Sequence, residues 1–220
     1  MKKILLIFLT LIGGLTLIAC KEKTEDLKFT YYYMYTFIAV DIKRGPIDLK
    51  DEIDENLDKI FRLYHDLGTY ATPLDYDTAY LENIYSINQK PLQKLEIDKP
   101  LYDMLEVAIE YHAMTDGLFD ISIGKIVDVW KSKVLDEYDG YLFKEIPEEV
   151  YQEVMETIDN INVYEDPFTI SMSEGKYYVE LNYADVKLDL GAIAKGYATQ
   201  KAAEYIESLG LGNYSITAGS

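Results

Sequence analysis

The chain has 220 residues, with 21 lysines and arginines against 39 aspartates and glutamates, and a formal net charge of −18 at pH 7. So acidic a surface makes nucleic acid a poor partner, because phosphate backbones are bound by clustered basic side chains. One cysteine leaves no pair for a disulfide, so the fold depends on its core, and this length can build one good-sized core or two small ones.

The first 19 residues read as a lipoprotein signal peptide. Lys2 and Lys3 precede an apolar run, Ile4 to Ile18, that is short for a membrane span. A small residue, Ala19, then precedes Cys20, as at the sites where bacterial lipoproteins are cleaved and acylated. We expect lipidation at Cys20 and a membrane-attached protein on the extracytoplasmic face of the cell membrane. The alternative is an uncleaved anchor with Cys20 as a bystander thiol.

Residues 20–28 are expected to form a polar tether, with structure beginning near Phe29. Residues 29–42 are rich in Tyr, Phe, Val and Thr, which favours one strand ended by Gly45 and Pro46. Apolar residues at helical spacing then predict a helix from Leu49 to Leu67, with Gly68 as its stop.

The rest of the chain alternates helical and extended patterns. Helices are predicted for Leu101 to Met114, Glu148 to Asp159 and Ile193 to Leu209. Strands are predicted for Phe168 to Met172, Tyr177 to Leu181, Val186 to Leu190 and Asn213 to Ala218, the first three as a β-meander. Without a regular βαβ alternation, the pattern indicates an α+β fold with a mixed, largely antiparallel sheet and packed helices.

The passage from Val186 to Ala198 carries the most chemical information. Alternation turns Val186 and its apolar neighbours inward, so Lys187 and Asp189 share the other face at the strand's end. Small residues follow, which allow a ligand to approach the backbone, and the helix N-terminus offers N–H groups to a phosphate beside Lys195. The passage fits neither the P-loop nor the Rossmann pattern, and tight packing is the alternative explanation.

The string D-L-G-A-I-A-K-G-Y-A within this passage resembles the D-L-[GS]-[GA]-I-[AG]-K-G-Y-A segment of the ApbE family of flavin transferases. The resemblance implies that Asp189 and Lys195 help to bind FAD. It also implies that the carbonyl of Ala192 is a ligand of Mg²⁺.

A second long match begins at Thr115 and ends at Trp130, and it resembles the family's T-x-G-x-F-D-x-[ST]-[VI]-G-P-L-x-x-x-W. It implies that Leu118, Phe119 and Asp120 line the flavin nucleotide. Lys125 stands where the family usually has proline. Taken without the family, the same residues predict a helix stop and an apolar extended segment, with the tryptophan in the core.

Weaker matches follow the family's order. Met34, in Met34-Tyr35-Thr36, stands in the family's M-G-T and is implied as a flavin contact, with tyrosine in place of glycine. Tyr70 is implied as an FAD contact, with Tyr76 as a rival, and Ile87-Asn88 resembles the family's L-N. Any one tyrosine among 21 is more simply explained by core packing.

Two further predictions concern the histidines and the last strand. His65 and His112 have no partner at metal-ligand spacing, so we expect surface or capping roles rather than a zinc site. Asn213 to Gly219 resembles the strand that leads into the family's N-x-G-G-[ND].

The resemblance implies an FAD:protein FMN transferase that needs FAD and Mg²⁺. A serine or threonine hydroxyl of an exported acceptor, of which electron-transfer proteins are the suggested class, would attack the FMN phosphorus and release AMP. The family's H-I-I-D-P-x-T-G and D-x-x-x-T segments do not occur in this sequence, so the catalytic base is unassigned.

We therefore expect residues 29–220 to be the N-terminal part of a longer transferase domain, incomplete at the C-terminus and unable to transfer FMN by itself. A natural short form is the alternative. Two other functions stay open: a surface flavin-binding or FAD-hydrolysing lipoprotein without transferase activity, and a general solute-binding lipoprotein with a chance match.

Overall fold

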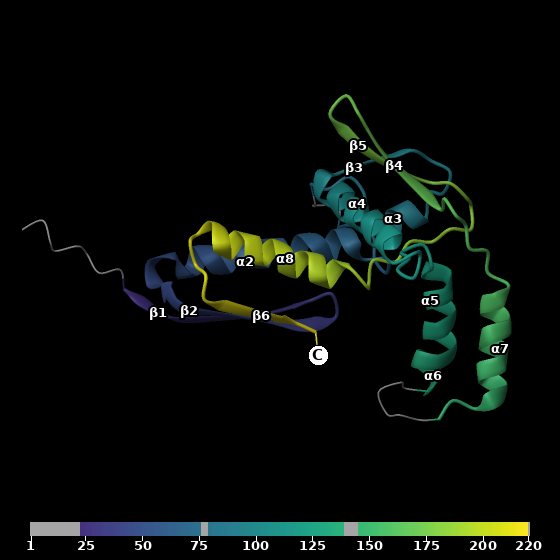
Figure 1. Ribbon diagram of the computed structural model, residues 1–220, viewed down its shortest axis with the longest axis horizontal. Helices are drawn as coiled ribbons and strands as arrows, with labels where there is room; N and C mark the ends of the chain where they lie inside the picture. Colours follow the sequence, from purple (N-terminus) through teal and green to yellow (C-terminus); the bar gives the residue numbers. More distant parts are fainter. Residues whose placement is uncertain (1–22, 76–78, 139–144, 220) are drawn as a thin grey trace, which may run out of the picture.

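Two antiparallel sheets of three strands each carry the helices of this protein (Figure 1). The computed structural model describes residues 23–75, 79–138 and 145–219. The predicted signal peptide, Cys20 and Tyr76 lie outside these residues. The mixture of helices and antiparallel strands confirms the predicted α+β class. Among the residues described, no helix has both the length and the apolar character needed to cross a bilayer.

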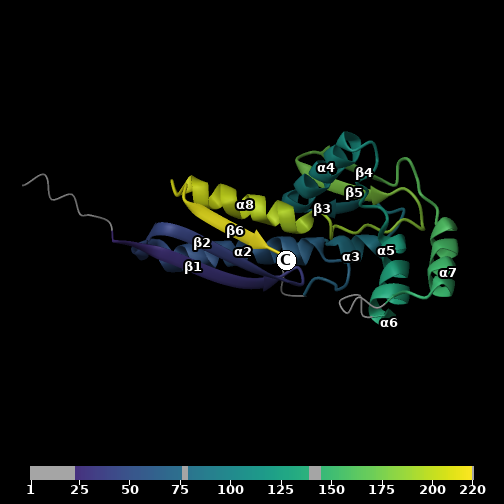
Figure 2. The ribbon, with the colours of Figure 1, turned by 60° about the horizontal axis from the view of Figure 1, so that its bottom comes forward.

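The first sheet has the strand order β1-β2-β6, with β1 at Thr24–Tyr33, β2 at Thr36–Pro46 and β6 at Tyr214–Ala218. Two helices, α2 (Lys50–Gly68) and α8 (Ala194–Ser208), pack side by side on one of its faces (Figures 1 and 2). That face is apolar because alternate strand residues point to it. The buried strand residues include Leu27, Phe29, Tyr31, Ile38, Val40 and Ile42.

The predicted single strand over residues 29–42 is wrong, because the chain turns back between Tyr33 and Thr36 and forms a hairpin. Alternating burial continues on both sides of the turn, so the pattern alone resembles one long strand. The strand also begins earlier than predicted. Thr24 to Lys28 belong to β1 rather than to a tether, because Leu27 is buried against the helices.

The second sheet has the order β3-β5-β4, with β3 at Leu95–Ile97, β4 at Phe168–Ser173 and β5 at Lys176–Leu181. The neighbouring helices are α3 (Ile84–Asn88) and α4 (Lys99–Met114). The predicted hairpin of β4 and β5 is confirmed, but its expected third strand is not. Residues 186–190 alternate between inward and outward side chains as predicted, yet their one bridge joins Lys187 to Ile123 in parallel.

A third group of helices lies below the second sheet in Figure 1. It contains α5 (Gly124–Trp130), a π-helical turn (Lys131–Leu135), α6 (Asp136–Tyr138) and α7 (Glu148–Asp159). The extended segment predicted to reach Trp130 is therefore wrong from Gly124 onward. The tryptophan is only partly buried and is not a core residue.

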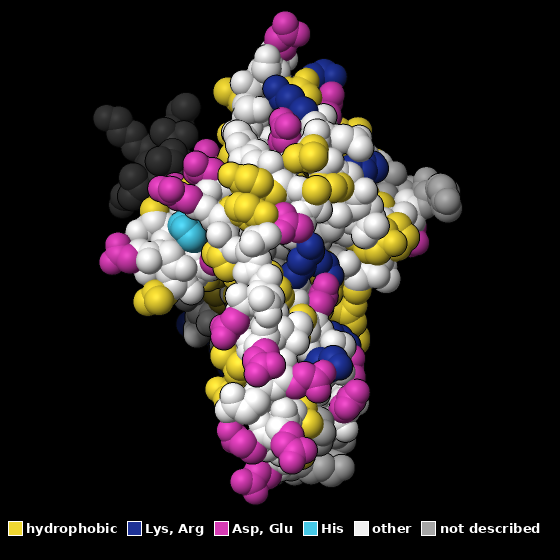
Figure 3. Space-filling model, turned by 90° about the vertical axis from the view of Figure 1, so that its right-hand side faces the viewer, with side chains coloured by type: hydrophobic (Ala, Val, Ile, Leu, Met, Phe, Trp, Pro, Cys, Tyr) yellow, Lys and Arg dark blue, Asp and Glu magenta, His cyan; other side chains and the backbone are white. Residues whose placement is uncertain are grey.

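The helices predicted from apolar spacing are confirmed as α2, α4, α7 and α8, with ends within two residues of those expected. A 3-10 turn (Ile47–Leu49) precedes α2. Helix α7 presents its acidic side chains to solvent. Figure 3, which views the molecule from the right-hand side of Figure 1, shows acidic groups gathered over the lower part of this side. Such a surface agrees with the poor fit to nucleic acid.

Candidate functional site

A cleft of about 490 Å³ lies where the β1–β2 turn, the end of α2 and the start of α8 meet. The β1–β2 turn, the start of α8 and the end of β6 lie at the same end of the first sheet (Figure 1). The volume is in the range of small-molecule sites, roughly 300–1,000 Å³. Of the residues implied by the resemblance, the structure brings four together on its walls: Met34, Tyr70, Asp189 and Lys195.

The β1–β2 turn has an unusual backbone. Met34 and Tyr35 both have positive φ, 52° and 58°, as a type I′ hairpin turn requires, although glycine or asparagine usually fills such positions. Nδ1 of His65 accepts a hydrogen bond from the Met34 N–H at 3.1 Å, and the rings of Tyr33 and Tyr35 pack against this histidine. His65 thus ties the turn to α2 at the edge of the cleft, which agrees with a non-metal role.

The segment that presents Asp189 is held from two sides. The side-chain amide of Asn88 donates to the Leu188 carbonyl at 2.9 Å and its oxygen accepts from the Leu188 N–H at 2.8 Å. From the other side, the Asp189 N–H donates to the Ile121 carbonyl at 2.8 Å. Asn88 therefore supplies, from a side chain, the pairing that a neighbouring strand would give.

The start of α8 forms the polar end of the cleft. The Asp189 carboxylate accepts the Gly191 N–H at 2.6 Å, and the Lys195 ammonium donates to the Gly191 carbonyl at 3.2 Å. No side chain caps the helix, and the Ala194 N–H donates to the Leu190 carbonyl at 2.9 Å, so the Lys195 and Gly196 N–H groups and the Lys195 charge point to an anion site. A side chain at Gly191 would place its Cβ 2.9 Å from the Asp189 carboxylate, so it would displace that carboxylate from its present position.

Aromatic side chains also line the cleft, among them Tyr35, Tyr64 and Tyr70. Burial, with the nearby Asp189 and Asp128 carboxylates, raises the pKa of the Tyr70 hydroxyl. Its ring therefore stays neutral over the physiological range. A cleft lined by both a neutral aromatic ring and a cationic helix end suits a ligand that has a flat ring and a phosphate group.

A second hollow, of about 590 Å³, lies on the other side of the first turn of α8. Phe119, Ala192 and Tyr197 are among its lining residues. For Mg²⁺ the fit is poor: Ala192 can offer one neutral carbonyl, whereas this ion prefers several oxygens including carboxylates. Among the described residues, no three histidine, cysteine or acidic side chains are grouped to hold a metal. No reaction step is therefore assigned to a metal here.

The loop after α4 is not gathered into the first cleft. Leu118 is 92% exposed, and Asp120 lines a third hollow of about 180 Å³ beside His112. Nδ1 of His112 donates to the Phe119 carbonyl at 2.8 Å, and the Thr115 hydroxyl accepts the Phe119 N–H at 2.9 Å. His112 thus fixes the loop's shape, while Leu118 is left free to contact a ligand or a partner.

Some residues on the cleft walls were not singled out by the sequence. Tyr64, Gly68 and Thr69 all line the cleft. Tyr64 and Gly68 are four residues apart and so share one face of α2, which is the signal that could have grouped them. Asn88 appeared in the sequence only as a weak motif match, and nothing in the sequence places its amide against Leu188.

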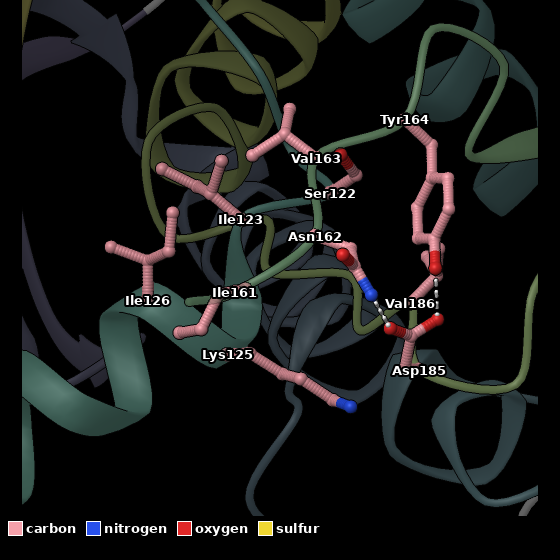
Figure 4. A pocket seen from close by; sticks show the side chains of 10 residues that line it. All are labelled: Ser122, Ile123, Lys125, Ile126, Ile161, Asn162, Val163, Tyr164, Asp185 and Val186. Atoms are coloured by element: carbon pink, nitrogen blue, oxygen red, sulfur yellow. Dashed lines mark hydrogen bonds between the residues drawn. The ribbon is translucent and has the colours of Figure 1, made fainter. Parts of the chain in front are cut away.

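A fourth pocket, of about 10 Å³, has room for about one water and is too small for a nucleotide (Figure 4). Asn162 and Tyr164 point at Asp185 and donate to its carboxylate at 2.9 and 2.7 Å. These two hydrogen bonds lower the pKa of Asp185. The two hydrogen bonds hold the loop 161–164 beside the segment that carries Asp189.

Comparison with known proteins identifies the family and the fold of this chain. The model of the ApbE family matches residues 34–220. The FAD:protein FMN transferase of Haemophilus influenzae is 23% identical, over 100% of this chain and 60% of its own length. That of Buchnera aphidicola subsp. Schizaphis graminum is 22% identical, over 97% of this chain and 58% of its own length.

Solved structures give the same fold. The flavin transferase ApbE from Vibrio cholerae superposes with a TM-score of 0.64 at 18% identity, over 88% of this chain and 57% of that one. The ApbE protein from Thermotoga maritima gives 0.63 at 21% identity, over 89% and 57%. The chain thus spans about three fifths of the length of these relatives. Because the family pattern matches residues 34–220, most of the sequence, this chain belongs to the ApbE family.

Proposed function

We propose that this chain binds FAD in the cleft and belongs to an enzyme that transfers FMN from FAD to a protein hydroxyl. The observation that carries the proposal is one cleft with an aromatic wall and a cationic helix end. Tyr70 and Met34 lie on its apolar side, and Lys195 lies at the uncapped start of α8. A flavin ring and a diphosphate need these two surfaces.

Each polar residue has a separate task in this proposal. Lys195 and the first-turn N–H groups of α8 stabilise the negative charge of the diphosphate. The Asp189 carboxylate, already fixed by the Gly191 N–H, accepts a hydrogen bond from a hydroxyl or N–H of the ligand.

In the proposed reaction the oxygen of a serine or threonine hydroxyl forms a bond to the FMN phosphorus, and the bond to the departing phosphate of AMP breaks. The hydroxyl proton is released, and we assign its acceptor to no described residue. Positioning and charge stabilisation are what a protein contributes to such a transfer.

Magnesium dependence is part of the proposal for the whole enzyme. The Ala192 carbonyl would be one ligand, and the remaining oxygens would have to come from FAD or from other protein groups. Mg²⁺ bound there would offset negative charge on the phosphates.

Attachment to the cell membrane through lipidated Cys20, on the extracytoplasmic face, is likewise proposed. Its support is the charged start, the short apolar run and Ala19-Cys20 in the sequence. A Cys20→Ala variant should accumulate as an uncleaved precursor without acyl label. Processing and lipidation like those of the natural chain would refute the anchor.

The function is tested by titrating the purified chain with FAD, and then by adding Mg²⁺ and an exported acceptor protein with one reactive threonine. Covalent flavin on the acceptor with equal AMP release supports transfer. AMP release without covalent flavin supports an FAD hydrolase. Tight binding without AMP is expected both of a flavin-binding lipoprotein and of a part of a transferase that cannot transfer FMN by itself, so it supports the FAD site and leaves transfer to be tested in a longer chain. A chain that binds no FAD contradicts the assignment of the cleft.

A further inference from the structure

Lys187 joins three parts of the fold behind the cleft. Its ammonium lies 5.1 Å from the centre of the Tyr70 ring, over the ring face, and 2.5 Å from a carboxylate oxygen of Asp128. Tyr70 follows α2, Asp128 lies in α5, and Lys187 lies two residues before Asp189. The lysine side chain is 24% exposed, so both contacts are made in a partly desolvated place.

The backbone at Lys187 is fixed. Its carbonyl accepts the Gly124 N–H at 2.9 Å, and any side chain at position 124 would place its Cβ 2.7 Å from that oxygen. The two hydrogen bonds between Asn88 and the next residue, Leu188, hold the same segment from the other side. The lysine therefore projects from a rigid base.

The loop that carries Tyr70 is held by hydrogen bonds to the residues that flank the tyrosine. The Thr69 carbonyl accepts the Tyr85 N–H at 3.0 Å, and the Thr72 carbonyl accepts from the Asn83 amide at 3.0 Å. The ring of Tyr70 faces the cleft, and Lys187 and Asp128 are not among the residues that line it. A cation over the ring face attracts the ring quadrupole, which favours one ring position.

We propose that Lys187, held by Asp128, is a positioning residue that keeps the Tyr70 ring on the cleft wall where the flavin binds; this rests on the proposed function. The ion pair has a second effect. Because the Lys187 ammonium forms an ion pair with Asp128, the lysine does not compete with Lys195 for the ligand's phosphates. Its influence on FAD passes through the tyrosine ring.

The first measurement needs no ligand. In protein labelled with fluorotyrosine, the Tyr70 fluorine signal is identified by its loss in Tyr70→Phe. Lys187→Met should shift or broaden this signal, Asp128→Asn should do so less, and Lys187→Arg should preserve it. Lys94→Met is the matched control, because Lys94 lies 4.5 Å from the Tyr178 ring in the second sheet and has the same chemistry elsewhere.

The second measurement is FAD affinity by calorimetry. Lys187→Met should weaken FAD about two- to fivefold, as expected for a cation–π contact at a partly exposed site, while Lys187→Arg and Lys94→Met leave it unchanged. In a Tyr70→Leu background, Lys187→Met should cause no further loss, because the two changes remove the same interaction.

An equal loss in both backgrounds, or an unchanged Tyr70 signal in Lys187→Met, would overturn the proposal. If Lys187→Met does not fold, the same comparison is made with Asp128→Asn, by measuring its effect on FAD affinity in the natural chain and in Tyr70→Leu. If the natural chain binds no FAD, the proposed function fails, and the fluorine signal alone decides whether Lys187 positions Tyr70.

Discussion

At the scale of single residues, Lys195 is the group whose charge the proposed site depends on most. Its ammonium lies beside the Gly191 carbonyl at the start of α8, where a phosphate would also meet the Lys195 and Gly196 N–H groups. Removing a charge-assisted contact to phosphate costs roughly 1.5–3 kcal/mol in a partly desolvated site. Lys195→Ala should therefore weaken FAD by that amount and riboflavin, which has no phosphate, far less.

Calorimetric titration of both ligands checks this difference. Lys176→Ala serves as the control, because that lysine pairs with Glu96 at 2.7 Å in the second sheet, away from the cleft. Equal losses for FAD and riboflavin in Lys195→Ala would show that the side chain acts through packing. The position of the phosphate at the helix N-terminus would then be wrong.

Gly196, in the first turn of α8, gives a second test with opposite effects on stability and binding. A Cβ added there meets nothing within 4 Å, and alanine is favoured over glycine in a helix by about 0.8–1 kcal/mol. Gly196→Ala should raise the free energy of unfolding by up to that amount, yet weaken FAD if the nucleotide lies against the helix start. Denaturant titration and calorimetry measure the two effects.

Gly124→Ala is the contrasting variant, since its Cβ would lie 2.7 Å from the Lys187 carbonyl. Overpacking of this kind costs typically about 1–3 kcal/mol. If Gly196→Ala leaves FAD affinity intact, the glycine is not kept for ligand approach, and the second hollow is not part of the nucleotide site.

At the scale of elements, the β1–β2 hairpin stores backbone strain beside the cleft. Tyr35 has a φ of 58°, and a left-handed conformation costs a non-glycine residue roughly 1–2 kcal/mol. Tyr35→Gly should therefore stabilise the protein by about 1 kcal/mol in chemical denaturation, because the tyrosine side chain is largely exposed and little packing is lost. Phe37→Gly is a suitable control: it removes an exposed aromatic residue of β2 without relieving a positive φ, so it should destabilise.

A loss of stability in Tyr35→Gly would mean that the edge contact of its ring with His65 outweighs the strain. Strained residues persist where the surrounding structure holds them, and they are often found at ligand sites. The same variant should therefore be titrated with FAD, since the tyrosine lines the cleft.

Helices α2, α4, α7 and α8 could be predicted from the sequence because each has an apolar face at 3.6-residue spacing, as α2 has Ile53, Leu57 and Phe61 before Gly68. The hairpin could not, because Met34 and Tyr35 give no turn signal. Residues 186–190 were predicted as a strand since their burial alternates correctly, but their partners are the Asn88 side chain and the backbone near Ile121. Local pattern cannot reveal a side-chain partner distant in sequence.

The same limit applies to the site. The two long motifs could be recognised in the sequence, and the structure shows that Asp189 and Lys195 line the same cleft as Met34 and Tyr70. The motif around Leu118, by contrast, lies outside that cleft, and only the fold shows this. Spacing in the sequence predicts which residues share a helix or strand, whereas the packing of helices and strands decides which residues line the same cleft.

At the scale of the whole molecule, the cleft is lined by residues from near both ends of the described chain. Met34 and Gly219 both line it, and β2 pairs with β6, so the N-terminal hairpin and the last strand are held together there. A ligand that contacts these parts binds the folded chain and not the unfolded one. Binding should therefore stabilise the entire fold rather than a single loop.

The magnitude follows from mass action. FAD at about a hundred times its dissociation constant should add roughly 2.7 kcal/mol to the free energy of unfolding. For a domain of this size, about 1 kcal/mol shifts the melting temperature by roughly 2–4 °C, so FAD should raise it by about 5–11 °C. Differential scanning calorimetry measures this shift, and Lys195→Ala at the same FAD concentration should show a smaller one.

Hydrogen exchange locates the effect within the molecule. Protection should rise together in the β1–β2 turn, in residues 189–195 and at the end of β6, because all three meet at the cleft. Protection confined to residues 107–119 and 192–204 would instead place FAD in the second hollow, whose lining lies in those ranges. A melting shift with protection in neither region would mean that FAD binds elsewhere on the surface.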